Sequence, residues 1–183
     1  MSRSDEQRFG ELYDRTYDPV WAFVLRRTPD EEAAADVVSE TFLVVWRRIR
    51  DVPTDPRKAD AWVFGTARRV LANWWRGTRR RGRLFERIRQ RPVDLLVDLS
   101  VTDESNHSVM QALSQLRPDQ REILSLAFWE ELDTDQIALV LGCSKNAAAV
   151  RLTRARQAWE AAFQAMPATG RTEGMAGHER GER

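Results

Sequence analysis

Residues 145–162 place cationic and hydrogen-bonding side chains on one face of a segment with helical spacing. At about 100° per residue, Ala148, Leu152, Ala155 and Trp159 share its apolar face. The other face and its flanks carry guanidinium, ammonium, amide and hydroxyl groups, which can bond base edges and phosphates in a DNA major groove. The residues assigned to this reading face are Lys145, Asn146, Ala149, Val150, Arg151, Thr153, Arg154 and Arg156. The predicted chemistry is noncovalent recognition of duplex DNA.

Capping signals around residues 133–144 predict the elements that hold this face in place. Asp133 is a favourable N-cap, and Gln136 stands three residues later, where a capping-box partner reaches back. A first helix is therefore expected over 134–141, ended by Gly142, and Ser144 caps a second over 145–162. A solvated basic helix on an ordinary bundle is the alternative. The short turn, paired caps and arginine-rich face favour a helix-turn-helix that binds DNA.

The segment from Lys58 to Arg80 combines aromatic rings with cations. Its apolar face contains Val63, Ala67, Val70 and Trp74. The opposite stripe holds Trp62, Thr66, Arg69, Asn73, Arg76 and Arg80. Interleaved arginine and aromatic side chains suit single-stranded nucleic acid, because a base stacks on a ring while guanidinium groups hold phosphates. The competing interpretation is that the tryptophans are core residues; it is favoured for Trp74 and stays open for Trp62 and Trp75.

A helix is also predicted between Pro29 and Asp51. Its apolar stripe is Ala34, Val38, Thr41, Phe42, Val45 and Ile49. Its other side carries a mixed set: Asp36, Ser39, Glu40, Leu43 and Arg47. Taken alone, these residue types favour an ordinary solvated face.

Charge is distributed unevenly along the 183 residues, although the net charge is only +1. Ten arginines and a single acid lie between Arg68 and Arg91, whereas 92–116 has no lysine or arginine. No segment alternates with period two, so we expect an all-α fold of two small helical domains joined by a flexible linker. The expected parts are a domain over 5–90, an acidic linker over 91–105, a helix-turn-helix domain over 106–163 and a disordered tail over 164–183.

Several classes of site are not supported by the sequence. The single cysteine, Cys143, is expected to fill the small core of the turn, and His107 and His178 lack partners at metal-binding spacing. We therefore expect no metal and no cofactor. No catalytic triad, carboxylate pair or phosphate-binding glycine loop is apparent, so an enzyme is disfavoured. No signal peptide or membrane-spanning run is present, which predicts a cytoplasmic protein without membrane insertion.

Three blocks, in order and spacing, resemble a bacterial protein family. They are DVVSETFLVVWRRI, AWVFGTARRVLANWWRGTRRR and LRPDQREILSLAFWEELDTDQIALVLGCSKNAAAVRLTRARQAWEAAF. Together they are similar to the extracytoplasmic-function (ECF) subfamily of the sigma-70 family of RNA polymerase sigma factors, over roughly residues 8–163. The resemblance implies that the mixed face of residues 36–47 binds core RNA polymerase. It also implies that Trp62 to Arg80 holds the melted minus-ten element, helped by the loop DVPTDPRKAD, and that the helix-turn-helix reads the minus-thirty-five element. An anti-sigma factor is a further implied partner.

Some residues depart from the usual pattern of that family. Ala149 and Val150 replace a basic residue and a serine, so we expect Arg154 and Asn146 to carry more of the direct base readout. Glu131 stands where glycine is frequent, which places a Cβ in a turn better suited to glycine. A two-domain helix-turn-helix regulator, which would normally dimerise on a palindrome, is the alternative function.

Overall fold

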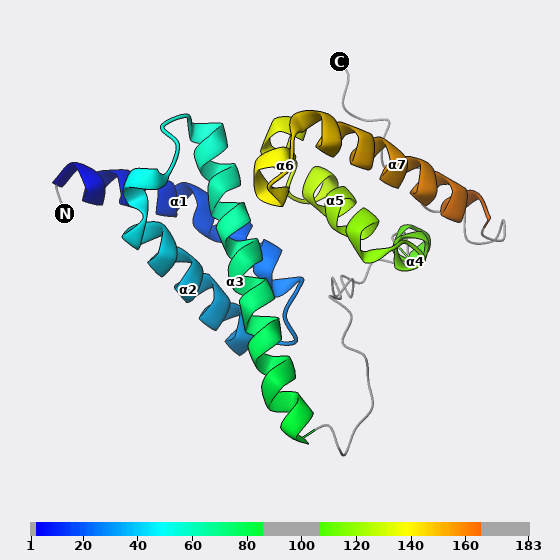
Figure 1. Cartoon of the computed structure of the whole chain (residues 1–183), viewed down its shortest axis with the longest axis horizontal. Coiled ribbons are helices and arrows are strands. Elements are labelled where there is room, and N and C mark those ends of the chain that lie inside the picture. The colour runs from blue at the N-terminus through cyan, green and yellow to red at the C-terminus, as the bar shows by residue number, and fades with distance from the viewer. Residues whose placement is uncertain (1–2, 86–106, 166–183) are drawn as a thin grey trace.

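Every described element of the molecule is a helix. The computed structural model describes residues 3–85 and 107–165, without the side chains of 79–85, 107, 108 and 110. No strand occurs in those ranges, so the predicted all-α class is confirmed. The elements are α1 (Arg3–Leu25), α2 (Glu31–Arg47), the 3-10 turn η1 (Ile49–Asp51), α3 (Pro56–Phe85), α4 (His107–Ser114), α5 (Pro118–Phe128), α6 (Thr134–Leu141) and α7 (Lys145–Gln164) (Figure 1). The predicted linker 91–105 lies outside the described residues, as does the predicted tail beyond residue 165.

Helix α2 lies within the predicted range 29–51, but it ends at Arg47, and Ile49 of the predicted stripe belongs to η1. The Asp30 carboxylate accepts a hydrogen bond from the Ala33 amide at 2.8 Å, and Glu31 and Glu32 lie at the positive end of the helix dipole. All six residues of the predicted apolar stripe are buried. Periodicity alone therefore identified the inner face of α2.

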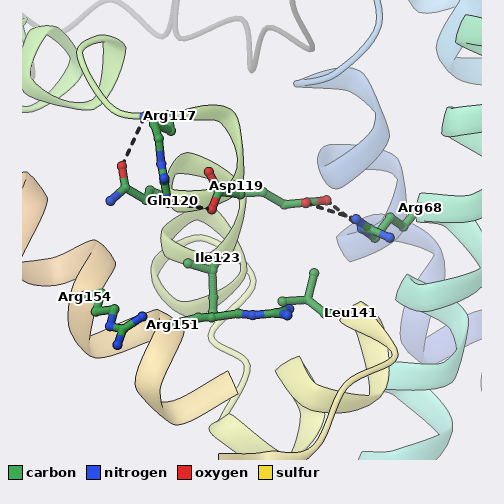
Figure 2. Close-up of a pocket in the computed structure, with 9 residues that line it drawn as sticks. Arg68, Arg117, Asp119, Gln120, Ile123, Leu141, Arg151 and Arg154 are labelled. Atoms are coloured by element: carbon green, nitrogen blue, oxygen red, sulfur yellow. Dashed lines mark hydrogen bonds and ion pairs between the residues drawn. The ribbon is translucent and has the colours of Figure 1, made fainter. Parts of the chain in front are cut away.

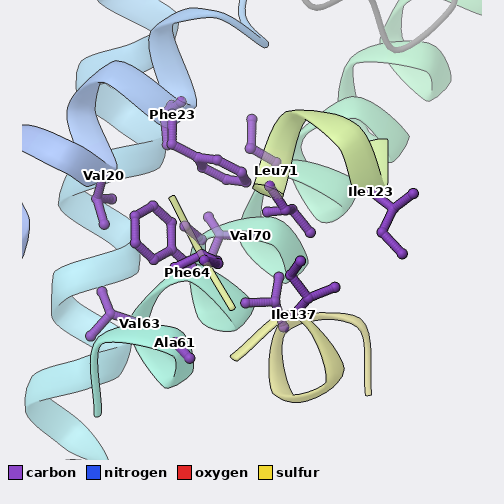
Figure 3. Packing of buried hydrophobic residues seen from close by; sticks show 14 of the residues in the cluster. Val20, Phe23, Ala61, Val63, Phe64, Val70, Leu71, Ile123 and Ile137 are labelled. Carbon is purple, nitrogen blue, oxygen red and sulfur yellow. The ribbon is translucent and has the colours of Figure 1, made fainter. Parts of the chain in front are cut away.

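The N-terminal half packs α1 and α3 against that inner face. The Phe23 ring of α1 meets the Phe64 ring of α3 edge-on, with centroids 5.4 Å apart. Val20 and Val63 are fully buried beside them (Figure 3). Trp74 is half-buried and packs against this core, as predicted. Trp75, whose role the sequence left open, is half-buried and donates its indole N–H to the Arg27 carbonyl at 3.2 Å.

The helix-turn-helix forms as its capping signals predict. Asp133 accepts from the Gln136 amide at 2.8 Å, and the Gln136 side chain accepts from the Asp133 amide at 3.1 Å. Gly142 adopts the left-handed conformation that ends α6, with φ of 65°. Glu131 has φ of 51°, the one non-glycine residue with positive φ in the described part of the chain, so its predicted poor fit to the turn is confirmed.

The two halves share one hydrophobic core. Phe64 and Leu71 of α3 belong to the same buried cluster as Ile123 of α5 and Ile137 of α6 (Figure 3). α6 lies directly against α3, where a Cβ built on Gly65 would be 3.5 Å from the Val140 Cα. The sequence predicted two domains, and the structure adds that they are closed against each other.

Candidate nucleic-acid interface

Helix α7 presents the predicted reading face to solvent. Its apolar residues Ala148, Leu152 and Ala155 are buried against the other helices of the C-terminal half. The predicted contacts Lys145, Asn146, Val150, Arg151, Thr153, Arg154 and Arg156 are exposed, and Ala149 is half-buried. Val150 is 42% exposed, so its isopropyl group is available to an apolar partner such as a thymine methyl.

Three polar groups of this face already interact with other residues of the protein. Lys145 donates to Asp135 at 2.8 Å, and this hydrogen bond raises the pKa of Lys145. The Thr153 hydroxyl donates back to the Ala149 carbonyl at 3.0 Å. The Arg156 guanidinium lies 5.8 Å from the centroid of the exposed Phe128 ring. These three groups must exchange or share a partner to contact DNA.

Arg151 and Arg154 instead line a cavity of about 450 Å³ between α3, α5 and α7 (Figure 2). Arg68 of α3 and Arg117, at the start of α5, line it too. Glu122 pairs with Arg68 at 2.6 Å and Asp119 pairs with Arg117 at 3.1 Å. Within the described residues, no carboxylate pairs with the two α7 arginines. Their charge is therefore free to attract phosphate.

The exposed side of α3 carries most of the second predicted set. Arg69, Asn73 and Arg76 are exposed, and Asn73 accepts a hydrogen bond from Arg76. Trp62 is half-buried. Arg80 lies within α3, but its side chain is outside the described part.

Thr66 differs from its expected position on that stripe. It is only 1% exposed, and its hydroxyl donates to the Trp62 carbonyl at 2.9 Å. The helical wheel placed Thr66 correctly beside Arg69, whose guanidinium donates to the Thr66 hydroxyl at 3.1 Å. A threonine is short enough for its neighbours to cover it, so Thr66 is absent from the accessible stripe, which keeps Trp62, Arg69, Asn73 and Arg76.

One arginine near the Trp62 ring, Arg48, was not singled out from the sequence. The Arg48 guanidinium lies 5.7 Å from the Trp62 ring centroid. Desolvation and the positive charges of Arg48 and Arg68 lower the pKa of Arg69. Arg48 is the residue that follows α2 and does not belong to α3, so periodicity within either helix could not reveal its approach to Trp62. Arg48 is paired with Asp51 and Arg68 with Glu122, whereas within the described residues no carboxylate pairs with Arg69, so Arg69 offers the charge that can bind a phosphate.

The loop before α3 is anchored by a residue that the sequence did not highlight. Arg8 of α1 donates to the carbonyls of Val52 at 2.5 Å, Pro53 at 2.9 Å and Ile49 at 3.3 Å. Asp55 accepts from the Lys58 amide at 3.0 Å as α3 begins. The first part of DVPTDPRKAD is therefore held in a defined conformation, and its last five residues belong to α3.

Helix α2 lies on the side of the N-terminal bundle away from the C-terminal half (Figure 1). The predicted members of its mixed face are all exposed: Asp36, Ser39, Glu40, Leu43 and Arg47. Leu43 is 40% exposed, which leaves an apolar side chain ringed by polar ones. Such a face can be solvated, or it can bind a protein partner.

Other kinds of site receive no support from the described residues. Across 3–85 and 107–165, no group of three or more histidine, cysteine, aspartate or glutamate residues could hold a metal ion. None of the helices in these ranges has the length and apolarity needed to cross a bilayer. Cys143 is half-buried and packs against the core, as predicted.

Two family models match the chain. Sigma-70 region 2 matches residues 12–81, and Sigma-70, region 4 matches residues 106–158. The first match contains most of the α1–α3 bundle, and the second contains the helix-turn-helix. Both parts of the candidate interface thus fall inside matched segments.

Individual relatives extend this similarity. The chain is 31% identical over 151 residues to the ECF RNA polymerase sigma factor BldN of Streptomyces coelicolor, covering 81% of this chain and 56% of BldN. It thus spans little more than half of BldN. It is 29% identical over 163 residues to the ECF RNA polymerase sigma factor SigL of Mycobacterium tuberculosis, covering 86% of this chain and 90% of SigL.

Solved structures share the arrangement of helices. The sigma factor RpoE of Bartonella quintana, in complex with the anti-sigma factor NepR, matches with a TM-score of 0.59 and 19% identity, covering 87% of this chain and 98% of RpoE. CnrH, in complex with the cytosolic domain of CnrY, matches with a TM-score of 0.57 and 25% identity, covering 87% of this chain and 89% of CnrH. The match to RpoE supports the fold alone.

Proposed function

Since the chain belongs to the ECF branch of the sigma-70 family of RNA polymerase sigma factors, we propose that it binds core RNA polymerase and directs promoter recognition, DNA melting and transcription initiation. One observation carries this proposal: a single chain exposes two chemically different nucleic-acid surfaces. α7 offers a duplex-reading face, and α3 offers an arginine stripe beside a tryptophan ring. A regulator that binds only duplex DNA has no use for the second surface.

The α3 surface is proposed to hold the minus-ten element as a single strand. Trp62 stacks on a base, Arg69 and Arg76 bind phosphates, and Asn73 bonds a base edge or sugar. Unstacking duplex DNA costs about 1.4 kcal/mol per step. A stacked base returns about 1 to 3 kcal/mol, so one base on Trp62 offsets one or two opened steps. Thr66 is left out of this role because it is buried.

The α7 face is proposed to read the minus-thirty-five element as duplex DNA. Arg154 and Asn146 bond base edges, while Arg151 and Arg156 bind phosphates and fix the register. Lys145 and Thr153 flank the face, and Ala149 and Val150 supply apolar contacts. The protein acts by binding energy rather than by bond chemistry, and polymerase performs the synthesis.

Two protein partners complete the proposal. We propose that the exposed α2 face around Leu43 binds core polymerase and that the protein acts in the cytoplasm. Its structural neighbours RpoE and CnrH were solved with the anti-sigma factor NepR and with the cytosolic domain of CnrY, respectively. We propose that an anti-sigma factor also holds this chain inactive.

Run-off transcription with purified core polymerase on a pool of promoters tests the function. The expected result is a stable stoichiometric complex with core and transcripts from a defined start point. A helix-turn-helix regulator acting without replacing sigma would instead give no complex with core. Failure to bind core, or binding without any defined start, would overturn the proposal.

A further inference from the structure

The cavity between α3, α5 and α7 has the charge of an anion-binding site. Four of its nine lining residues are arginines and two are carboxylates, so the lining carries a net charge of +2. The three uncharged residues are Gln120, Ile123 and Leu141. A hollow lined by an excess of one sign of charge attracts ions of the other sign. The charged ligand that fits this cavity is therefore an anion.

Two of the four arginines have no carboxylate to neutralise them. Arg151 and Arg154 are three positions apart on α7, so their side chains leave the helix on one side. Within the residues that the structure describes, neither guanidinium forms an ion pair or donates a hydrogen bond. The planar fork of an arginine matches a pair of phosphate oxygens. Both groups are thus available to a phosphorylated ligand.

Arg117 can join them with little loss. It pairs with Asp119 at 3.1 Å, but the two side chains are 72% and 70% exposed. An ion pair this exposed adds little to stability, so Arg117 can exchange Asp119 for a ligand phosphate. Arg68 behaves differently, since it donates twice to Glu122, at 2.6 and 3.1 Å. Arg68 is a fixed part of the cavity wall.

The start of α5 supplies a further positive end and a free amide. Arg117 is the N-cap of α5 and Gln120 lies in its first turn, so the positive end of the helix dipole borders the cavity. The Gln120 side-chain oxygen accepts from the Arg117 amide at 3.2 Å, which leaves its NH₂ group available as a donor. Figure 2 shows Arg117 and Gln120 at this end of α5, with Arg151 and Arg154 below them on α7.

The size and the apolar part of the lining indicate more than a single phosphate. The cavity volume of about 450 Å³ lies within the range of about 300 to 1,000 Å³ that small-molecule sites occupy. Ile123 and Leu141 give it apolar surface, which an inorganic anion cannot use. A nucleoside can pack on that surface and bond the Gln120 amide through its base. Linked phosphates on the same molecule can reach several arginines at once.

We propose that this cavity binds a nucleoside diphosphate or triphosphate through Arg117, Arg151 and Arg154, and that the bound nucleotide displaces upstream DNA from α7. The second part rests on the proposed function, which assigns Arg151 and Arg154 to that DNA. A guanidinium that is bidentate to a nucleotide phosphate has no fork left for a DNA phosphate or base. Promoter binding should therefore fall as the nucleotide concentration rises.

Calorimetric titration of the full chain, without polymerase or DNA, tests the binding site. ADP and GDP are the probes, each compared with its monophosphate and with inorganic diphosphate at about 0.15 M salt, where the Debye length is about 8 Å. At least one probe should bind about tenfold more tightly than both controls. A monophosphate that binds as tightly would remove the role of linked phosphates, and inorganic diphosphate that binds as tightly would remove the nucleoside. Either result would overturn the proposal.

Arginine variants locate the binding. Arg117→Ala, Arg151→Ala and Arg154→Ala should each weaken nucleotide binding about tenfold, which corresponds to about 1.4 kcal/mol. Arg156→Ala is the matched control, because Arg156 is also an exposed arginine of α7 but lies near the Phe128 ring and does not line the cavity. It should bind the nucleotide as wild type does. Equal weakening by Arg156→Ala would show a general attraction of anions to a basic helix and overturn the proposal.

Promoter complexes with core polymerase, assembled without RNA synthesis, test the competition. Adding the tighter diphosphate should release wild-type complexes. Complexes of Arg117→Ala should need about tenfold more nucleotide for half-release, because Arg117 lines the cavity but is not on the reading face of α7. No release, or equal release of both, would overturn the proposal. If no form of the chain gives a promoter complex, the proposed function fails instead, and the calorimetry still decides whether the cavity binds a nucleotide.

Discussion

Replacing Arg154 with alanine should change which upstream sequence this protein prefers. Arg154 is exposed on α7 and faces the cavity that Arg151 shares. Within the described residues it forms no ion pair, so the substitution breaks no internal ion pair of the folded chain. The main effect should therefore appear in DNA binding.

The expected magnitude follows from the two kinds of contact proposed. A bidentate arginine contact to guanine is worth about 1 to 3 kcal/mol of base discrimination, which corresponds to about 5- to 150-fold. Arg151→Ala should instead weaken all sequences alike, because a phosphate contact carries no base information. Its loss should reduce the slope of log K against log salt by about 0.9.

The assay is selection by the complex with core polymerase from promoters randomised over the upstream element. Arg154→Ala should relax the preference at one or two positions, while Arg151→Ala should keep the preference and flatten the salt dependence. An unchanged preference in Arg154→Ala would refute the assignment of direct readout. A changed preference in Arg151→Ala would refute its assignment to phosphate.

Four other predictions concern single positions. Glu131→Gly should raise the melting temperature by about 2 to 4 °C through a gain near 1 kcal/mol; an unchanged or lower value would contradict the strain at φ of 51°. Asp133→Ala should cost about 0.5 to 2 kcal/mol in denaturant unfolding while Asp133→Asn keeps the cap; equal losses would implicate the Arg57 pair instead. Leu43→Asp should weaken capture by core polymerase without lowering stability, and undiminished capture would remove α2 from that interface. Arg76→Ala should weaken binding to a minus-ten single strand and reduce its salt slope by about 0.7; an unchanged slope would show that Arg76 binds no phosphate.

The helix-turn-helix could be predicted almost residue by residue. The capping residues bond or end the backbone within three or four positions of themselves, so the local sequence is enough to predict their effects. They are Asp133, Gln136, Gly142 and Ser144. The unfavourable backbone at Glu131 was foreseen for the same reason. The exposed faces of α2 and α7 followed from periodicity, since one buried stripe fixes the direction of the other side chains.

The burial of Thr66 could not be predicted from periodicity. A helical wheel gives the direction of a side chain but not the height of its neighbours, so it could not show that this hydroxyl is covered. Arg48, which approaches Trp62, was missed because the two residues lie on different helices.

The sequence by itself determined the helices, their caps and their chemically distinct faces, because hydrogen bonds and side-chain spacing within a helix depend on residues a few positions apart. Only the tertiary structure decided that α6 lies on α3, with Arg26 and Arg27 against a glutamate about 100 residues away. Pairing of distant charges depends on which surfaces meet. In this chain Gly65, which has no side chain, lets the α6 backbone approach α3 closely.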